Sequence, residues 1–164
     1  MQTMRHIHTM AHDARAVANA LIERANQENQ PLTPMQIIKL VYICHGWMLG
    51  LYGRPLIRQS VEAWRYGPVV SALYQGLRQY GDTHVRQPIS TDDGQFDEYE
   101  ADLISQVWEK YKHLTGISLS RLTHAPGTPW HTIWNMQGQN SIIPQDLIEE
   151  HYARKARASS AQPS

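Results

Sequence analysis

The hydrophobic positions in the first third of the chain repeat with the period of an α-helix. Between residues 13 and 27, apolar side chains recur at i, i+3, i+4, i+7, i+8 and i+11, which predicts an amphipathic helix. The same period resumes over residues 34–52, at a proline that follows Thr33 and precedes Gln36. A threonine cap, a proline in the first turn and a glutamine three residues after the cap are typical of a helix start. Two consecutive helices are therefore predicted here.

The helix predicted over residues 34–52 is apolar almost all round, so we expect it to be the buried central helix. Its remaining side carries Tyr42, Gly46 and Gly50, spaced four residues apart. Glycine inside a helix costs about 1 kcal/mol relative to alanine. Two glycines on one stripe therefore predict that another backbone packs closely there. We expect this neighbour to be the extended segment that follows the helix.

Short strands are predicted after a glycine-proline break at residues 53–55. Residues 56–58 and 61–64 have strand-like composition on either side of a polar pair, with helix as the alternative. A two-stranded ribbon is marginal alone, so we expect it to lie on the helices. The next helix is predicted to begin at Pro68 and to run to about Tyr80.

The second half of the chain predicts four further helical segments. Turn-forming residues separate residues 97–113, 118–122, 129–134 and 144–152, each of which carries apolar residues at helical spacing. The expected fold class is therefore mostly α, in the α+β sense. We expect a compact helical domain around a buried central helix, with a small two-stranded β-ribbon.

A chain of 164 residues is long enough for one domain with a stable hydrophobic core. We assign this domain to residues 13–152. A frayed N-terminus is expected at residues 1–12, where the periodicity is weak, and a polar, disordered tail at residues 153–164.

Charge and composition argue against several classes of protein. With 15 Lys and Arg against 15 Asp and Glu, no net charge favours nucleic acid or an anionic membrane. The few basic residues at 151–157 do not make nucleic acid an expected partner. No apolar run reaches the ~18–20 residues of a membrane span, and the single Cys44 cannot form an intramolecular disulfide. We expect a cytoplasmic protein without a membrane partner.

No group of residues with a catalytic pattern stands out. Cys44 and His45 are adjacent, so on a helix their side chains point about 100° apart. Cys44 also lies on the buried stripe, where a thiol is inert. The acids at residues 92–93 and 98–102 are interpreted as loop residues and as charges that favour a helix start. The histidines match no zinc spacing, so we expect neither a metal nor a cofactor.

One alternative keeps a chemical function open. His45, Tyr66 and His124 can hydrogen-bond and titrate. If the fold brought them together, they would line a pocket that binds or hydrolyses a small molecule or a peptide. Thr123 and His124 also precede a Pro-Gly turn that Trp130 follows, which suggests a clasp fixed by side-chain hydrogen bonds and anchored by an indole.

Two segments of the chain together have a distinctive set of residues. The first contains Lys39-Leu40, Tyr42, His45-Gly46-Trp47, Leu56 and Glu62-Ala63-Trp64-Arg65-Tyr66-Gly67-Pro68-Val69, and the second Leu119-Ser120, Thr123-His124 and Pro129-Trp130. With these residues in this order, the chain resembles the Panacea domain family, also called the SocA-like antitoxin or phage-associated GepA-type domain. The resemblance covers approximately residues 13–152.

The resemblance implies a mostly helical domain that acts as the antitoxin of a toxin–antitoxin system. Its expected partner is a cognate toxin, because members of the family look like antitoxins that neutralise toxins encoded beside them by direct protein–protein binding. One branch resembles a proteolytic adaptor, which makes a ClpXP-type protease a second expected partner. The resemblance implies a binding protein rather than an enzyme and leaves the oligomeric state open.

The candidate partner-binding residues are Trp64, Arg65 and Tyr66, because aromatic residues and arginine dominate interface energetics. The alternative is that Trp64 and Tyr66 only pack against Tyr42 and the glycine stripe. The other residues that carry the resemblance are expected to hold the fold. They are Lys39, Tyr42, His45, Gly67, Pro68, Thr123, His124 and Trp130.

Overall fold

The computed structural model of the protein describes residues 11–161. In this range it contains seven α-helices, a 3₁₀ turn and a three-stranded antiparallel sheet. The predicted mostly α fold with a small β element is therefore confirmed. Residues 1–10 of the predicted frayed N-terminus and residues 162–164 of the predicted tail lie outside the described residues. The assignment of the domain to residues 13–152 stays a prediction.

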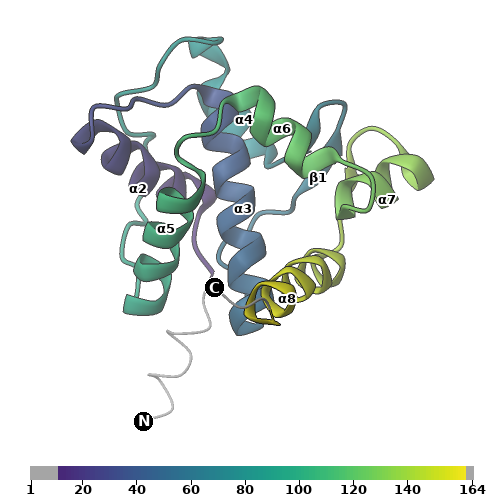
Figure 1. Ribbon diagram of the computed structural model, residues 1–164. Coiled ribbons are helices and arrows are strands. Elements are labelled where there is room, and N and C mark those ends of the chain that lie inside the picture. The colour runs from purple at the N-terminus through teal and green to yellow at the C-terminus, as the bar shows by residue number, and fades with distance from the viewer. Residues whose placement is uncertain (1–10, 162–164) are drawn as a thin grey trace.

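Helix α3 (Pro34–Tyr52) runs through the centre of the molecule (Figure 1). Its start is capped as predicted, because Thr33 and Gln36 exchange side-chain-to-backbone hydrogen bonds. It ends at Gly53, whose φ of +68° is left-handed. Every residue from Ile37 to Leu49 is buried, which confirms the predicted central helix. No helix in the described range, α3 included, combines the length and hydropathy that crossing a bilayer needs.

Six further helices in the described range pack around α3. They are α2 (Ala14–Gln27), α4 (Ser71–Leu77, continued by the 3₁₀ turn η1 at Arg78–Tyr80), α5 (Glu98–Tyr111), α6 (Gly116–His124), α7 (Pro129–Gln137) and α8 (Gln145–Ala161). In Figure 1, α2 and α5 lie on one side of α3, and α7 lies on the other. Helices α2, α5, α6 and α8 all contact α3 and form one hydrophobic core with it.

The two glycines of α3 make room for helix α8. A Cβ atom on Gly50 would lie 2.6 Å from the backbone carbonyl carbon of Tyr152, and one on Gly46 would overlap the Tyr152 ring. That ring also packs edge-on against Tyr42 and Trp47, with centroids 6.2 and 5.3 Å away. The predicted close approach of another backbone is confirmed. Its expected identity is wrong, because the neighbour is the C-terminal helix and not the segment that follows α3.

The sheet differs from the predicted two-stranded ribbon. Its strands are β1 (Glu62–Trp64), β2 (Gly67–Val69) and β3 (Ser141–Ile142), in the spatial order β2-β1-β3. Trp64 pairs with Gly67, so only two residues connect β1 to β2. Gly67 has a φ of +119°, which glycine adopts without a steric cost. Because Pro68 lies in the edge strand β2, the predicted helix begins later, at Ser71.

Residues 56–58 do not form the predicted strand, because the N-terminal segment uses their backbone groups. The N–H of His12 donates to Leu56 O, and the N–H of Arg58 donates to His12 O, both at 2.9 Å. These bonds form an isolated parallel bridge instead of a ladder. They also fix the backbone of His12, so the prediction of fraying is wrong for this residue.

Helix α8 extends beyond its predicted end at residue 152. It continues to Ala161, so the predicted disordered tail is wrong for residues 153–161. Tyr152 is buried, and Ala156, one turn later, packs against the core. The inward face of the helix therefore continues past residue 152 although most of the residues around it are polar.

Candidate partner-binding groove

A buried lysine fastens the β1–β2 hairpin to the central helix. Lys39 is 2% exposed, and its Nζ donates a hydrogen bond to the carbonyl oxygen of Pro68 at 2.9 Å. A Cβ atom on Gly67 would come within 2.8 Å of this nitrogen, so the lysine needs a glycine there. Burial lowers the pKa of the Lys39 ammonium to about 7. No carboxylate among the described residues forms an ion pair with it.

Helices α6 and α7 clasp the turn of the hairpin. Ser120 Oγ donates to the carbonyl oxygen of Tyr66, and Trp130 Nε1 donates to that of Trp64, both at 2.6 Å. The ring of His124 packs edge-on against Trp130 at 5.2 Å. The expected clasp is therefore present. Sequence reasoning missed the role of Ser120, because nothing local links it to a backbone carbonyl 54 residues away.

Thr123 and Tyr42 have roles inside the fold. Thr123 Oγ1 donates to Leu119 O at 2.9 Å within α6, and the side chain lies beside Gly67. Tyr42 is 1% exposed, and burial raises the pKa of its hydroxyl. Both side chains are buried, so neither is available to a partner on the surface.

A groove of about 480 Å³ opens beside the clasped hairpin. Its lining comes from the first turns of α3, from the hairpin, and from α4 and η1. Most of the lining side chains are apolar or aromatic, namely Pro34, Met35, Ile38, Trp64, Tyr66, Val69, Tyr74 and Leu77. Concave, largely apolar sites of this size are typical of binding sites.

The three candidate contact residues all line this groove. Trp64 packs edge-on against Tyr74 with ring centroids 4.9 Å apart. Tyr66 is 62% exposed, and the Arg65 guanidinium carbon lies 5.5 Å from its ring centroid. The alternative, in which these aromatic rings pack on Tyr42 and the glycine stripe, is wrong, because α8 occupies that place. Their contact with a partner stays a proposal.

His45 binds backbone and does not line this groove. It is 2% exposed, and its Nδ1 accepts hydrogen bonds from the N–H groups of Leu56 and Ile57 at 3.2 and 3.3 Å. Burial lowers the pKa of its imidazole to about 4, so His45 is neutral at pH 7. No hydrogen bond or ring contact within residues 11–161 joins His45 to Tyr66 or His124. The alternative pocket built from these three residues is therefore not formed.

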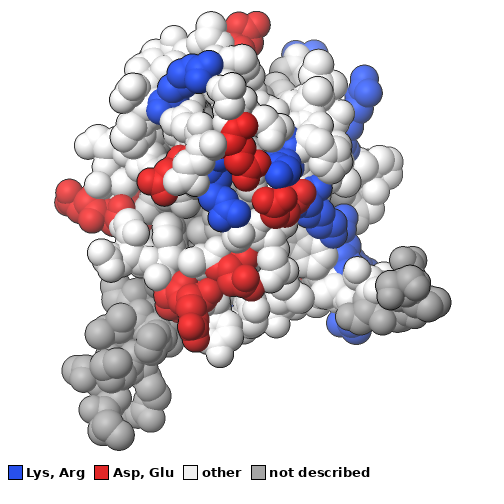
Figure 2. All heavy atoms as spheres, turned by 60° about the vertical axis from the view of Figure 1, so that its left-hand side comes forward, with Lys and Arg blue, Asp and Glu red and all other residues white. Residues whose placement is uncertain are grey.

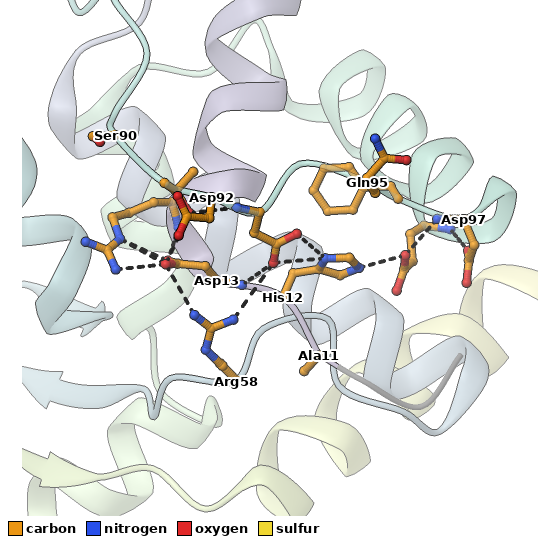
Figure 3. Close-up of a pocket in the computed structure, with 13 residues that line it drawn as sticks. Ala11, His12, Asp13, Arg58, Ser90, Asp92, Gln95 and Asp97 are labelled. Carbon is orange, nitrogen blue, oxygen red and sulfur yellow. Dashed lines mark hydrogen bonds and ion pairs between the residues drawn. The ribbon is translucent and has the colours of Figure 1, made fainter. Parts of the chain in front are cut away.

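A second, polar pocket of about 930 Å³ lies between the N-terminal segment and the loop before α5 (Figure 3). At its centre, His12 Nδ1 lies 3.0 Å from Asp93 Oδ1, and His12 Nε2 lies 2.9 Å from Glu100 Oε1. Only the protonated ring donates from both nitrogens. Burial opposes this charge, but the hydrogen bonds to Asp93 and Glu100 outweigh it and raise the pKa of His12.

Arginines neutralise the carboxylates of this polar pocket. The ion pairs are Arg15–Asp13, Arg58–Asp13, Arg58–Asp93, Arg54–Asp97 and Arg54–Glu100, with N–O distances from 2.8 to 3.8 Å. On the face that Figure 2 turns forward, acidic and basic side chains accordingly lie next to one another. The described residues contain no group of three or more His, Cys, Asp or Glu arranged to hold a metal ion.

The interpretation of Asp93 and Glu100 as ordinary loop and helix-start acids is wrong. Glu100 is 3% exposed and also caps α5 together with Asp97. Both acids bind His12, which lies 81 and 88 residues away in the chain. The capping box was visible in the sequence, but a contact over such a separation leaves no local pattern.

The chain matches the family model described as "Antitoxin SocA-like, Panacea domain" over residues 37–131. This range includes Lys39, the hairpin and the clasp through Trp130. The chain is also 31% identical over 138 residues to Antitoxin SocA of Caulobacter vibrioides (strain NA1000 / CB15N), which covers 78% of this chain and 73% of that protein. No solved structure matches it significantly. The chain therefore belongs to the family of SocA-like antitoxins with a Panacea domain.

Proposed function

We propose that this chain is a cytoplasmic antitoxin that neutralises a cognate toxin by direct binding and without catalysis. The groove beside the β1–β2 hairpin is the binding site. One observation carries this assignment: a hairpin turn with both carbonyl oxygens fixed from behind presents Tyr66, 62% exposed, at the edge of an apolar groove. An exposed aromatic side chain on a rigid support loses little conformational freedom when it binds.

Physical chemistry supports the hairpin turn as the energetic centre of the interface. Tyr, Trp and Arg account for most of the binding energy in protein–protein interfaces, and Trp64, Arg65 and Tyr66 are consecutive here. The side chains of Met35 and Tyr74 add exposed apolar surface next to them. Such clusters on a soluble domain mark interaction sites more often than accidental exposure.

The test is co-expression with the protein encoded by the neighbouring gene. Wild-type chain is expected to restore growth and to co-purify with that protein. The Tyr66→Ala variant is expected to weaken the complex more than tenfold, as is typical of a central interface residue. Tyr99→Ala is the matched control, because Tyr99 is also exposed, at 56%, but lies outside the groove. Equal toxicity with and without the wild-type chain would refute the proposal.

Neutralisation by binding alone and neutralisation by toxin degradation are separable. If the chain is an adaptor, it presents the bound toxin to a ClpXP-type protease. In a host without ClpX, a purely inhibitory antitoxin still restores growth, whereas an adaptor does not, and the toxin accumulates. Toxin half-life in the two hosts, followed by immunoblot, distinguishes these two forms of the same function.

A further inference from the structure

The groove contains positive charges without any negative ones. Lys39, Arg65 and Arg78 line it, whereas no Asp or Glu does. None of the three forms an ion pair with another described residue. Glu62 accepts a hydrogen bond from Trp64 Nε1 at 2.9 Å but does not line the groove. The surface that is suited to a partner is therefore apolar and cationic, although the whole chain is neutral.

The polar pocket shows that this is not the general arrangement in the fold. There, Arg15, Arg54 and Arg58 each lie within 4 Å of at least one carboxylate oxygen (Figure 3). In that pocket the charges are compensated within the chain. In the groove, compensation has to come from outside, either from solvent or from a bound partner.

Lys39 is the most demanding of the three cations. Its ammonium group has three N–H donors, but its only acceptor within the described residues is the Pro68 carbonyl oxygen. An unpaired ammonium at 2% exposure is costly, and this burial lowers the pKa of the group. A carboxylate placed in the groove next to Lys39 would remove that cost and form a charge-assisted hydrogen bond.

The positions of the cations indicate the shape of the missing group. Lys39 lies on α3, Arg65 in the hairpin turn and Arg78 in η1, so three separate elements each contribute one charge to the groove. A single terminal carboxylate cannot satisfy three separate cations. A continuous stretch of chain with more than one acidic side chain can, while its apolar side chains cover Trp64 and Tyr74.

We propose that the groove binds an internal segment of the toxin in which Asp or Glu side chains stand among large apolar side chains. This inference rests on the proposed function and specifies the chemistry of the partner. The apolar side chains supply buried area, and the carboxylates select the segment, because opposite charges across an interface determine specificity and association rate. A basic segment is rejected, since it would meet three uncompensated cations.

The first test measures binding of the intact toxin to charge variants of the groove. The double variant Arg65→Gln/Arg78→Gln changes two exposed side chains, so folding is expected to be unaffected. Its affinity for the toxin is expected to fall at least tenfold, with a weaker dependence on salt than in the wild type. Arg86→Gln/Arg157→Gln is the matched control, because it removes two exposed arginines that lie outside the groove. Lys39→Met, checked for folding by urea denaturation, is expected to weaken binding in the same direction.

The second test identifies the segment. Overlapping fluorescein-labelled peptides of 15 residues from the neighbouring gene's product are titrated with the wild-type chain. The tightest-binding peptide is expected to contain acidic and large apolar residues. Replacing its Asp and Glu by Asn and Gln should cost at least tenfold with the wild type, and much less with Arg65→Gln/Arg78→Gln, because the two changes remove the same interaction.

The outcomes separate this inference from the proposed function. If the intact toxin does not bind the wild type, the proposed function fails. If the toxin binds but the groove double variant binds equally well, the function stands and the acidic segment is refuted. The inference is equally refuted if only neutral or basic peptides bind, or if no peptide binds although the intact toxin does.

Discussion

At the scale of single residues, two histidines have opposite electrostatic environments and therefore different structural roles. His12 lies between two carboxylates, which favour its protonated form. His45 is buried among apolar residues of α3, where desolvation keeps it neutral and its Nδ1 accepts from backbone N–H groups. The first joins the N-terminal segment to α5 as a cation, and the second holds the chain after α3 as a hydrogen-bond acceptor.

We expect His12 to make stability depend on pH. Because the fold raises its pKa, its contribution is complete below the unfolded-state pKa of about 6.5 and is lost as pH rises through the folded-state pKa. The variant His12→Gln should therefore be less stable than the wild type by about 1–2 kcal/mol at pH 6. At pH 8.5 the difference should be clearly smaller. Urea denaturation at the two pH values measures both differences.

The groups around His12 do not titrate in this window. Asp93 and Glu100 bind it directly, and Arg54 and Arg58 bind these two carboxylates. Carboxylates and guanidinium groups keep their charges between pH 6 and 8.5. His84→Gln is a suitable control, because it removes an exposed histidine without touching the network. A His12→Gln difference that is equal at both pH values would contradict the assignment.

A second residue-scale prediction concerns the clasp. Trp130→Phe keeps an aromatic ring but removes the Nε1 donor that binds the Trp64 carbonyl oxygen at 2.6 Å. The free energy of unfolding should fall by about 1 kcal/mol, and toxin affinity should fall because the hairpin is less fixed. Trp134→Phe provides the comparison, since Trp134 stacks on Trp130 at 5.2 Å without donating a hydrogen bond within the described residues. Equal stabilities of the two variants would show that the clasp contributes nothing through this bond.

At the scale of elements, the packing of α8 on α3 depends on the absence of two Cβ atoms. In Gly50→Ala the new methyl group would lie 2.6 Å from backbone of α8, which cannot move away as a flexible side chain can. Overpacking of this kind costs about 1–3 kcal/mol. Urea denaturation should show this loss. Gly94→Ala, where nothing lies within 4 Å of the added Cβ, should leave stability nearly unchanged; a similar loss in both variants would contradict the close packing.

The elements also show what the sequence could predict. Helices α2, α3 and α5 were predictable because each has a clear apolar stripe, and α3 also has the Thr33–Gln36 capping box. The strands were not, because two or three residues are too few to show a period of two. Strand β3 is paired with β1 across some 80 residues, a contact that only the tertiary fold specifies. Helix α8 was underestimated because its inward positions lie among polar residues.

At the scale of the whole molecule, two pockets of different character divide the surface. The groove is apolar with unpaired cations, and the polar pocket has its charges paired within the chain. A toxin bound in the groove should therefore slow amide hydrogen exchange in residues 34–39, 64–69 and 74–81. Residues 11–15 and 90–100 should exchange at unchanged rates. Exchange measured by mass spectrometry on the free chain and on the complex tests this, and protection confined to the polar pocket would contradict the proposal.

The candidate site was predictable in part, and the boundary has a physical reason. Trp64, Arg65 and Tyr66 drew attention because large aromatic residues cluster around a Gly-Pro pair. Arg78 and Met35 did not, because they come from elements 13 residues after and 29 residues before the turn, and only the fold brings them to the same groove. The polar pocket was missed for the same reason, since His12 meets its partners across more than half the chain.

The contact between α3 and Tyr152 sets the order in which a new chain becomes complete. Helix α3 leaves the ribosome early, but Tyr152, which fills its glycine notch, is made about 100 residues later. At ~5–20 residues per second, translation leaves this notch uncovered for several seconds. A chain released before residue 152 would keep it open permanently, with the rings of Tyr42 and Trp47 uncovered. The cell's supply of working protein therefore consists of chains translated through their last helix.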